Sequence, residues 1–279
     1  MTTTEVSKFT EYLGNTLRDI SIPPCPVILE RINSEMRKDE PCFNQLALVI
    51  GSDVGLSAGL ISLANSPYFG IRCRVRSVNE ALNILGLRIT SRAIAGLILR
   101  NLFPDTPMLV RFWDASASIA RLSGWLSKNL DGIATRAEDA YTFGLFRDCG
   151  IAVLMQRLPD YPDTLKKANG ETHLSFTAIE EARYPTNHAV VGCLLAQSWW
   201  LPEEICIAIR HHHEYPPISQ QNSATLNMIA IAQLAEHLFQ KQTKLSETCE
   251  WGKASAFCME RLGLDNESLI GIYGKIPGL

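Results

Sequence analysis

The sequence predicts an all-α fold, an orthogonal array of more than ten helices joined by short connections. Apolar residues recur at helical spacing along most of the chain, and the alternation typical of strands is nearly absent. Glycines and prolines divide the chain into segments of helix length, with no internal repeat and no low-complexity stretch. The chain has 279 residues, of which 46% are hydrophobic, and this is enough for one large domain or two small ones.

A loop near residues 103–107 is expected to separate two lobes. In the N-terminal lobe, residues 1–105, Pro26 suits the first position of a helix, where a missing N–H is tolerated. Ser77 and Glu80 have the spacing of a capping box ahead of a second apolar helix. Gly55-Leu56-Ser57-Ala58-Gly59 matches the nucleophile pattern of serine hydrolases. Because its neighbours form one amphipathic helix and no strand precedes it, we interpret this segment as a helix.

The second lobe, residues 106–279, includes the C-terminal helices and contains the most apolar helix of the chain. Between Asp139 and Arg157 the only charged residues are Arg147 and Asp148. A helix that is apolar almost all round is buried, and buried charges need partners. Adjacent residues on a helix do not face each other, so the partners must come from elsewhere. Two interpretations stay open: a functional site, or ion pairs that only tie helices together.

Histidines mark two further helices of the second lobe. In the helix that begins after Pro202, His212 and His213 follow the apolar face and are predicted to point inward, whereas His211 is predicted to be exposed. His188 begins another apolar stripe. Three inward histidines and Asp148 would suit a divalent metal, since imidazole and carboxylate are ligands of such ions. The alternative is that each histidine is a hydrogen-bonded core or helix-end residue.

Composition excludes several classes of protein. The net charge is −3 and no basic tract is present, which argues against a nucleic-acid surface. No apolar run approaches the roughly 18 residues of a membrane helix, and residues 1–5 lack the features of a signal peptide. We therefore expect a cytoplasmic protein without a membrane partner. The eight cysteines include no C-x-x-C pair, which indicates free thiols, most of them buried.

Several segments, taken in order, resemble the HDOD domain, the HD-related output domain of bacterial signalling proteins. The resemblance covers roughly residues 15–240, and the combination of motifs is more specific than any single one. The segments are Ile22-Pro23-Pro24-Cys25-Pro26, residues 52–57 leading to Leu63-Ala64-Asn65-Ser66, residues 77–86, Phe112-Trp113 with Ser116, residues 144–150, residues 188–192, and residues 200–204 running into Ala208-Ile209 and His212-His213.

The resemblance implies kinship with the HD metal phosphohydrolases, in which a divalent cation polarises a phosphoryl group and lowers the pKa of bound water. The positions that match the HD ligands are Ala115, Arg147, Asp148 and Gln233, so only Asp148 is kept. Alanine cannot coordinate, arginine does not deprotonate, and glutamine is an uncharged, weak ligand. The resemblance thus implies a degenerate HD-like lobe without catalytic residues or a bound metal. Arg147 is expected either to replace the lost cation and pair with Asp148 or a neighbouring carboxylate, or to bind an anionic group.

These observations favour a non-catalytic signalling module that acts on a protein partner in trans. Leu63, Ala64, Asn65 and Ser66 and the cleft between the lobes are candidate interaction surfaces, and no cofactor is expected. The alternative is a phosphohydrolase of nucleotides or phosphate esters that holds iron, manganese, zinc or nickel at Asp148, His188, His212 and His213. A third interpretation is a nucleotide that is bound but not cleaved. Trp199 and Trp200 are expected to pack in a core or an interface.

Overall fold

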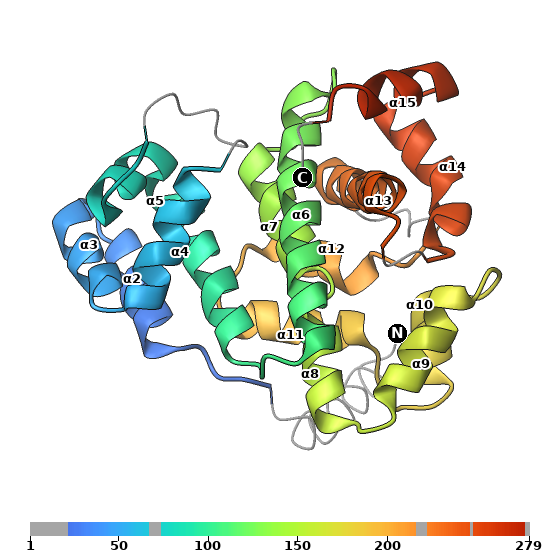
Figure 1. Cartoon of the computed structure of the whole chain (residues 1–279), viewed down its shortest axis with the longest axis horizontal. Coiled ribbons are helices and arrows are strands. Elements are labelled where there is room, and N and C mark those ends of the chain that lie inside the picture. Colours follow the sequence, from blue (N-terminus) through green and yellow to red (C-terminus); the bar gives the residue numbers. More distant parts are fainter. Residues whose placement is uncertain (1–21, 67–73, 216–221, 246–247, 277–279) are drawn as a thin grey trace, which may run out of the picture.

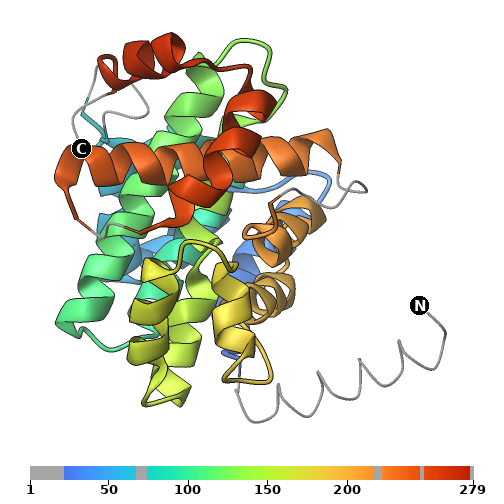
Figure 2. The same cartoon turned by 90° about the vertical axis from the view of Figure 1, so that its right-hand side faces the viewer.

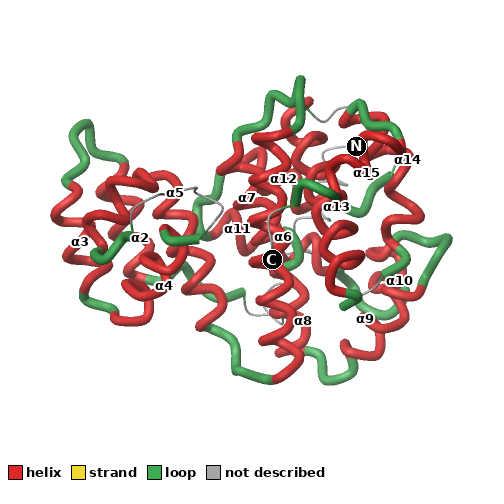
Figure 3. Tube along the Cα trace, turned by 45° about the horizontal axis from the view of Figure 1, so that its top comes forward, coloured by secondary structure: helices red, strands yellow, loops and turns green. Residues whose placement is uncertain are grey.

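The structure, a computed structural model, describes residues 22–66, 74–215, 222–245 and 248–276, and every regular element in these ranges is an α-helix (Figure 3). The prediction of an all-α fold is therefore confirmed. The N-terminal lobe lies on the left of Figure 1. It consists of α2 (Val27–Met36), α3 (Phe43–Gly51), α4 (Val54–Ala64) and α5 (Val78–Asn101).

Helix α6 begins at Pro107, so the boundary expected at residues 105/106 falls in the loop between α5 and α6. The division into two domains stays a prediction, and "second lobe" here means the helices from α6 onward. Its two longest helices cross steeply, since Figure 1 views α13 nearly end-on beside an upright α6 and Figure 2 shows α13 lying across it. The helices are α6 (Pro107–Asn129), α7 (Ala137–Phe146), α8 (Cys149–Arg157), α9 (Tyr161–Gly170), α10 (Phe176–Glu181), α11 (His188–Ser198), α12 (Glu203–His211), α13 (Ser223–Thr243), α14 (Glu250–Leu262) and α15 (Asn266–Tyr273).

The helix starts follow the signals in the sequence. The hydroxyl of Ser77 accepts a hydrogen bond from the backbone N–H of Glu80, as a capping box requires, while the Glu80 carboxylate accepts from the N–H of Arg76. Pro26 and Pro202 are the N-cap residues of α2 and α12, one position before the first helical residue. The segment with the serine hydrolase pattern lies inside α4, so it forms no strand-to-helix turn.

One hydrophobic core runs through both lobes. Its buried residues include Leu29, Leu60 and Ile94 from the N-terminal lobe and Phe146 and Ile209 from the second. A second cluster lies where α6 and α7 meet α13 and α14. Because the lobes share apolar contacts rather than a linker, a change in the packing of one lobe must be felt by the other.

The candidate interaction motif, residues 63–66, has a structural role at the end of α4. Ala64 is fully buried. The side chain of Asn65 accepts a hydrogen bond from the N–H of Val75 at 2.8 Å and donates to the Val75 carbonyl at 2.9 Å. This pair of bonds ties the end of α4 to the segment that leads into α5. A role in protein contacts stays a prediction.

Helix α5 has the length and the apolar composition of a membrane-spanning helix, which the apolar runs in the sequence did not predict. Its most apolar window is 56% buried in the fold, and the helix bends at Gly86, whose φ of 72° is left-handed. These are properties of a core helix. Among the described residues the cysteines are free, and most are wholly or partly buried, as predicted.

Candidate metal centre

Asp148 lies at the junction of α7 and α8, where it is the N-cap residue of α8. The next turn of α8 touches α11 so closely that a β-carbon on Gly150 would lie 2.0 Å from the carbonyl oxygen of His188. Only glycine permits this approach. The contact places Asp148 beside the first residue of α11, which is His188.

The three predicted inward histidines come from the start of α11 and the end of α12. The side chain of Asn187 caps α11 by accepting a hydrogen bond from the N–H of Val190, which fixes where the helix begins. His212 is the C-cap residue of α12, and His213 follows it. His188, His212 and His213 are all buried, whereas His211 points away and bonds Glu214. The orientations read from helical phase are therefore confirmed for His212 and His213.

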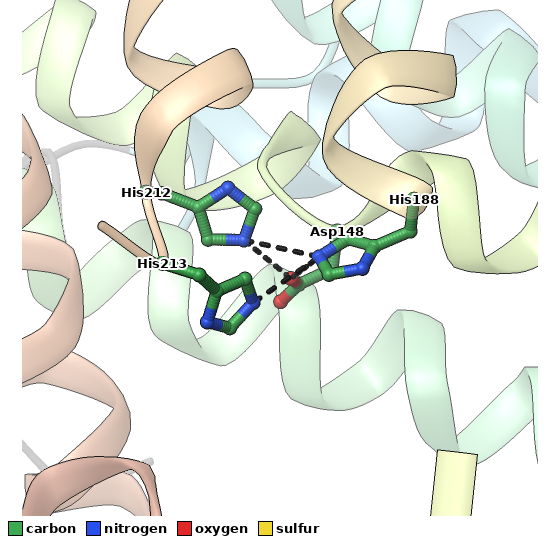
Figure 4. Close-up of side chains that lie close together, drawn as sticks. All are labelled: Asp148, His188, His212 and His213. Atoms are coloured by element: carbon green, nitrogen blue, oxygen red, sulfur yellow. Dashed lines mark hydrogen bonds and ion pairs between the residues drawn. The ribbon is translucent and has the colours of Figure 1, made fainter. Parts of the chain in front are cut away.

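The four side chains meet at one point (Figure 4). Nε2 of His188 lies 3.2 Å from Nε2 of His212 and 3.2 Å from Nε2 of His213. Oδ1 of Asp148 lies 3.2 Å from Nε2 of His212 and 3.7 Å from Nε2 of His188. Two donors that are each about 2.1 Å from one ion lie about 3.0 to 3.4 Å apart, so most of these separations match the edges of a coordination shell.

Each imidazole is held by an acceptor on its outer nitrogen. Nδ1 of His188 lies 2.7 Å from Glu180, Nδ1 of His213 lies 2.6 Å from Glu250, and Nδ1 of His212 lies 2.7 Å from the carbonyl oxygen of Ile209. These acceptors require an N–H on every Nδ1. In the neutral rings the three Nε2 atoms then present lone pairs to one another, and a cation at their centre removes the repulsion. The donor set therefore fits a divalent metal.

The surroundings shift the pKa values of the cluster residues in different directions. Burial lowers the pKa of His188, but the neighbouring carboxylates of Glu180, Asp148 and Glu250 together outweigh burial and leave this pKa raised. Burial and the neighbouring His212 and His188 hold the pKa of His213 well below its usual range. Burial raises the pKa of Asp148, yet Arg147 and the hydrogen bond with His212 outweigh it and hold the pKa well below normal.

Arg147 does not occupy the point between the histidines. Its guanidinium lies on the other side of Asp148, with Nε 3.0 Å from Oδ2, and its Nη2 lies 2.7 Å from Glu236. The predicted pairing with Asp148 and a neighbouring carboxylate is present. Asp148 thus faces a fixed guanidinium with one oxygen and the three histidines with the other, so the arginine stands beside the candidate metal position rather than in it.

The other two positions that match HD ligands do not contribute to the cluster. Ala115 is on α6 and lines a cavity with Arg147. Gln233 is buried, donates to the hydroxyl of Tyr215 and lies 3.4 Å from the carbonyl oxygen of His212. Ala115, Arg147 and Asp148 line the same cavity, and the assignment of these four positions as a degenerate HD site stays a prediction. Only Asp148 belongs to the histidine cluster.

Three buried or partly buried carboxylates were missed from the sequence, namely Glu180, Glu236 and Glu250. Glu180 precedes His188 by eight residues across a turn, and Glu250 is on another helix, so no local spacing marks either of them. Glu236 could have been found, because it follows Gln233 by three residues and shares its face of α13.

A cavity of about 580 Å³ adjoins the cluster and reaches the surface. Asp148, His213 and Arg147 form part of its wall, together with Glu236 and Glu250. The volume is in the range of small-molecule sites.

The chain is similar to several known proteins. A 25% identical uncharacterized protein of Treponema pallidum (strain Nichols) aligns over 244 residues, which are 86% of this chain and 46% of that protein, so the chain spans about half of this relative. An HDOD domain protein of unknown function from Geobacter sulfurreducens has a TM-score of 0.67 at 20% identity, covering 94% of this chain and 95% of that one. A provisionally named phosphohydrolase from Shewanella amazonensis SB2B has a TM-score of 0.67 at 19% identity, covering 93% of both chains.

These structures establish the shared fold. The model of the HDOD domain matches residues 22–215, which is more than half of the chain, and the matched region contains Asp148 and all three histidines. Helices α13 and α14, which supply Glu236 and Glu250, lie beyond it. The chain therefore belongs to the HDOD domain family, whose members are associated with signalling and with HD-like proteins.

Proposed function

We propose that the protein is a regulatory module of bacterial signalling that acts through protein contacts, and that one divalent cation holds its second lobe together. Asp148, His188, His212 and His213 would hold the ion. The observation that carries the proposal is the convergence of three Nε2 atoms whose Nδ1 atoms all have acceptors. The sequence motifs predicted no bound metal because most HD ligands are replaced, and we propose to revise that expectation in view of this donor set.

A structural role of the ion is supported by the completeness of the site. Structural zinc sites have four protein ligands, whereas catalytic sites keep a position for water. Here four protein donors are available, and the second oxygen of Asp148 is engaged by Arg147. Arg147 is in turn engaged by Glu236, so the polar groups next to the ion neutralise one another. Such an arrangement stabilises the junction of α8, α11 and α12 and leaves no unpaired base beside it.

The first experiment measures metal content by mass spectrometry, on protein purified without a histidine tag and dialysed against trace metal. We expect about one divalent ion per chain and its loss in His212→Ala, because this removes a central donor. His211→Ala is the matched control, since His211 bonds Glu214 outside the cluster. A wild-type protein without metal, or a His212→Ala variant with full metal content, contradicts the metal centre.

The regulatory role is tested by partner binding. The wild-type chain and His212→Ala should be isolated from the native cell with their bound proteins, and each candidate partner should then be tested by reciprocal tagging and by co-elution of the two purified proteins. We expect a partner whose binding depends on the metal-loaded form, because a change in lobe packing would expose or remove the binding face. Equal recovery of every protein by both chains counts against a metal-linked output.

A second candidate function, a metal-dependent phosphohydrolase, is favoured by the cavity beside Asp148 and His213. When bound, the ion would polarise a phosphoryl oxygen and lower the pKa of water. Arg147 would orient an anionic substrate, and Asp148 would hold the ion together with the three histidines. Turnover of bis(p-nitrophenyl) phosphate or a nucleotide that disappears in Asp148→Ala supports this function. Inactivity with iron, manganese, zinc and nickel favours the regulatory module.

A further inference from the structure

A second cavity, of about 510 Å³, lies between the two lobes and has no part in the metal centre. One wall comes from α2 and α5, including Asn33, Met36 and Arg88. The opposite wall comes from the second lobe and includes Arg136 and Trp200. A molecule in this cavity would touch both lobes at once, so its binding and the packing of the lobes are coupled.

Trp200 occupies a backbone position that favours glycine. The N–H of Leu201 bonds the carbonyl oxygen of Ala196, and the N–H of Trp200 bonds that of Gln197, which together form the Schellman motif that ends α11. Trp200 is the residue in the left-handed conformation, with a φ of 60°. A positive φ is uncommon for a bulky residue, and this outlier motivates a functional hypothesis for the side chain of Trp200.

The indole of Trp200 is available to a ligand. Trp199 is buried and donates its Nε1–H to the carbonyl oxygen of Pro23, as expected for a core tryptophan, but Trp200 is 51% exposed. The guanidinium of Arg37 lies 4.8 Å from its ring centroid. Arg37 covers one face of the indole, so a planar base would stack on the opposite face or displace the guanidinium.

Arginines lie on both walls of the cavity. Three arginines line the cavity, Arg88, Arg92 and Arg136, together with the carboxylates of Asp139 and Glu204. Arg92 pairs with Asp139 at 2.5 Å, and Arg136 pairs with Glu138 at 2.5 Å. Arg88 is left with Glu138 at 4.0 Å, and its side chain is 51% exposed. An arginine fork without a close partner is suited to a phosphate group.

We propose that the cavity between the lobes binds a nucleoside phosphate, with its base against Trp200 and its phosphate at Arg88 and Arg136. Neither feature suffices alone, because a lone exposed arginine binds anions weakly and a lone indole binds any flat ring. Thr135 on the same wall has a buried hydroxyl without a hydrogen-bond partner among the described residues, and a small shift would let it serve the ligand. The regulatory role of this site rests on the proposed function, whereas nucleotide binding by itself can be tested independently of it.

The test is calorimetric titration of the full chain with ATP, GTP, CTP and UTP, each to about 1 mM, with adenosine, guanosine and pyrophosphate as partial ligands. We expect saturable binding of one molecule per chain by at least one nucleotide. We also expect that nucleotide to bind at least about tenfold more tightly than its nucleoside or pyrophosphate, because base and phosphate contribute together. Absence of saturable binding by all four nucleotides, or equally tight binding of pyrophosphate, overturns the proposal.

Variants locate the site. Arg88→Gln and Trp200→Gly should each weaken binding about tenfold or more, since each removes one of the two contacts. Trp200→Gly is expected to fold, because glycine is the favoured residue at this position of the Schellman motif. Trp200→Tyr should recover part of the affinity, and Arg157→Gln, an exposed arginine at the end of α8, should change nothing. Nucleotide binding that persists in Arg88→Gln and Trp200→Gly would place the ligand elsewhere and overturn the proposal. Metal content is measured on the same samples, so that a wrong nucleotide site can be distinguished from a wrong metal centre.

Discussion

Glu180 is expected to control metal affinity although it does not reach the metal position. Its carboxylate is fully buried and accepts hydrogen bonds from the hydroxyl of Tyr161 and from the backbone N–H of His188 at 3.2 Å, and it lies 2.7 Å from Nδ1 of His188. Glu180→Gln keeps the size of the side chain but removes the negative charge. The amide also presents its own N–H groups to three donors, so at least one contact is lost.

The magnitude follows from the bond to His188. A hydrogen bond to a charged group contributes about 1.5–3 kcal/mol and a neutral one about 0.5–1.5 kcal/mol, so the exchange costs about 1–2 kcal/mol. This charge also makes the imidazole a stronger ligand and fixes its tautomer. Loss of such an outer partner lowers metal affinity by about 10- to 100-fold, or about 1.4–2.7 kcal/mol. The two estimates overlap, and we expect a loss near the tenfold end.

The assay is competition with a chelator for zinc and for manganese, at one pH, with thermal unfolding measured on the same samples. Glu203→Gln is the control, because Glu203 is an exposed carboxylate in the first turn of α12. The control should bind metal like the wild type. Unchanged affinity in a Glu180→Gln variant that folds normally would refute the claim that the outer acceptors orient the cluster.

Three further changes have defined outcomes. Gly150→Ala should destabilise the fold by at least about 3 kcal/mol, because the new methyl group would overlap the backbone of α11. Gly252→Ala on α14 is the control and should be neutral or stabilising, because no atom lies near its added methyl group. Equal chemical denaturation midpoints for the two variants would contradict this prediction. Arg147→Ala should lower the free energy of unfolding in urea by about 3–5 kcal/mol, since it leaves buried carboxylates without a counter-charge. A variant as stable as the wild type would mean that these ion pairs do not stabilise the fold. Asp148 has a depressed pKa in the folded state, so its stabilisation is present above an unfolded pKa of about 3.9 and is lost as the pH falls below it. In metal-free protein, the loss of stability on acidification should be shallower in Asp148→Asn, and parallel curves would exclude this residue as the cause.

The sequence by itself determined the fold class and the facing of the key side chains. Apolar residues at helical spacing and clear capping signals specify helices locally, and the phase of the helix after Pro202 was enough to turn His212 and His213 inward. The isolated charges of Arg147 and Asp148 in an apolar stretch also required partners. The fold class and the facing of the histidines could be predicted because they depend on spacing within one or two helical turns, whereas the partners of these two charges include Glu236 and His212 on other segments.

Only the tertiary structure decided which groups meet. The convergence of His188 with Asp148 depends on the close crossing of α8 and α11 at Gly150, and no local spacing encodes a crossing. The same holds for Glu180 and Glu250, which reach the histidines from other helices, and for Trp200, whose exposure depends on how the lobes face each other. Helical phase gives the direction of a side chain from its own axis, whereas a site requires the relative positions of several axes, and these are set by the packing of the whole core.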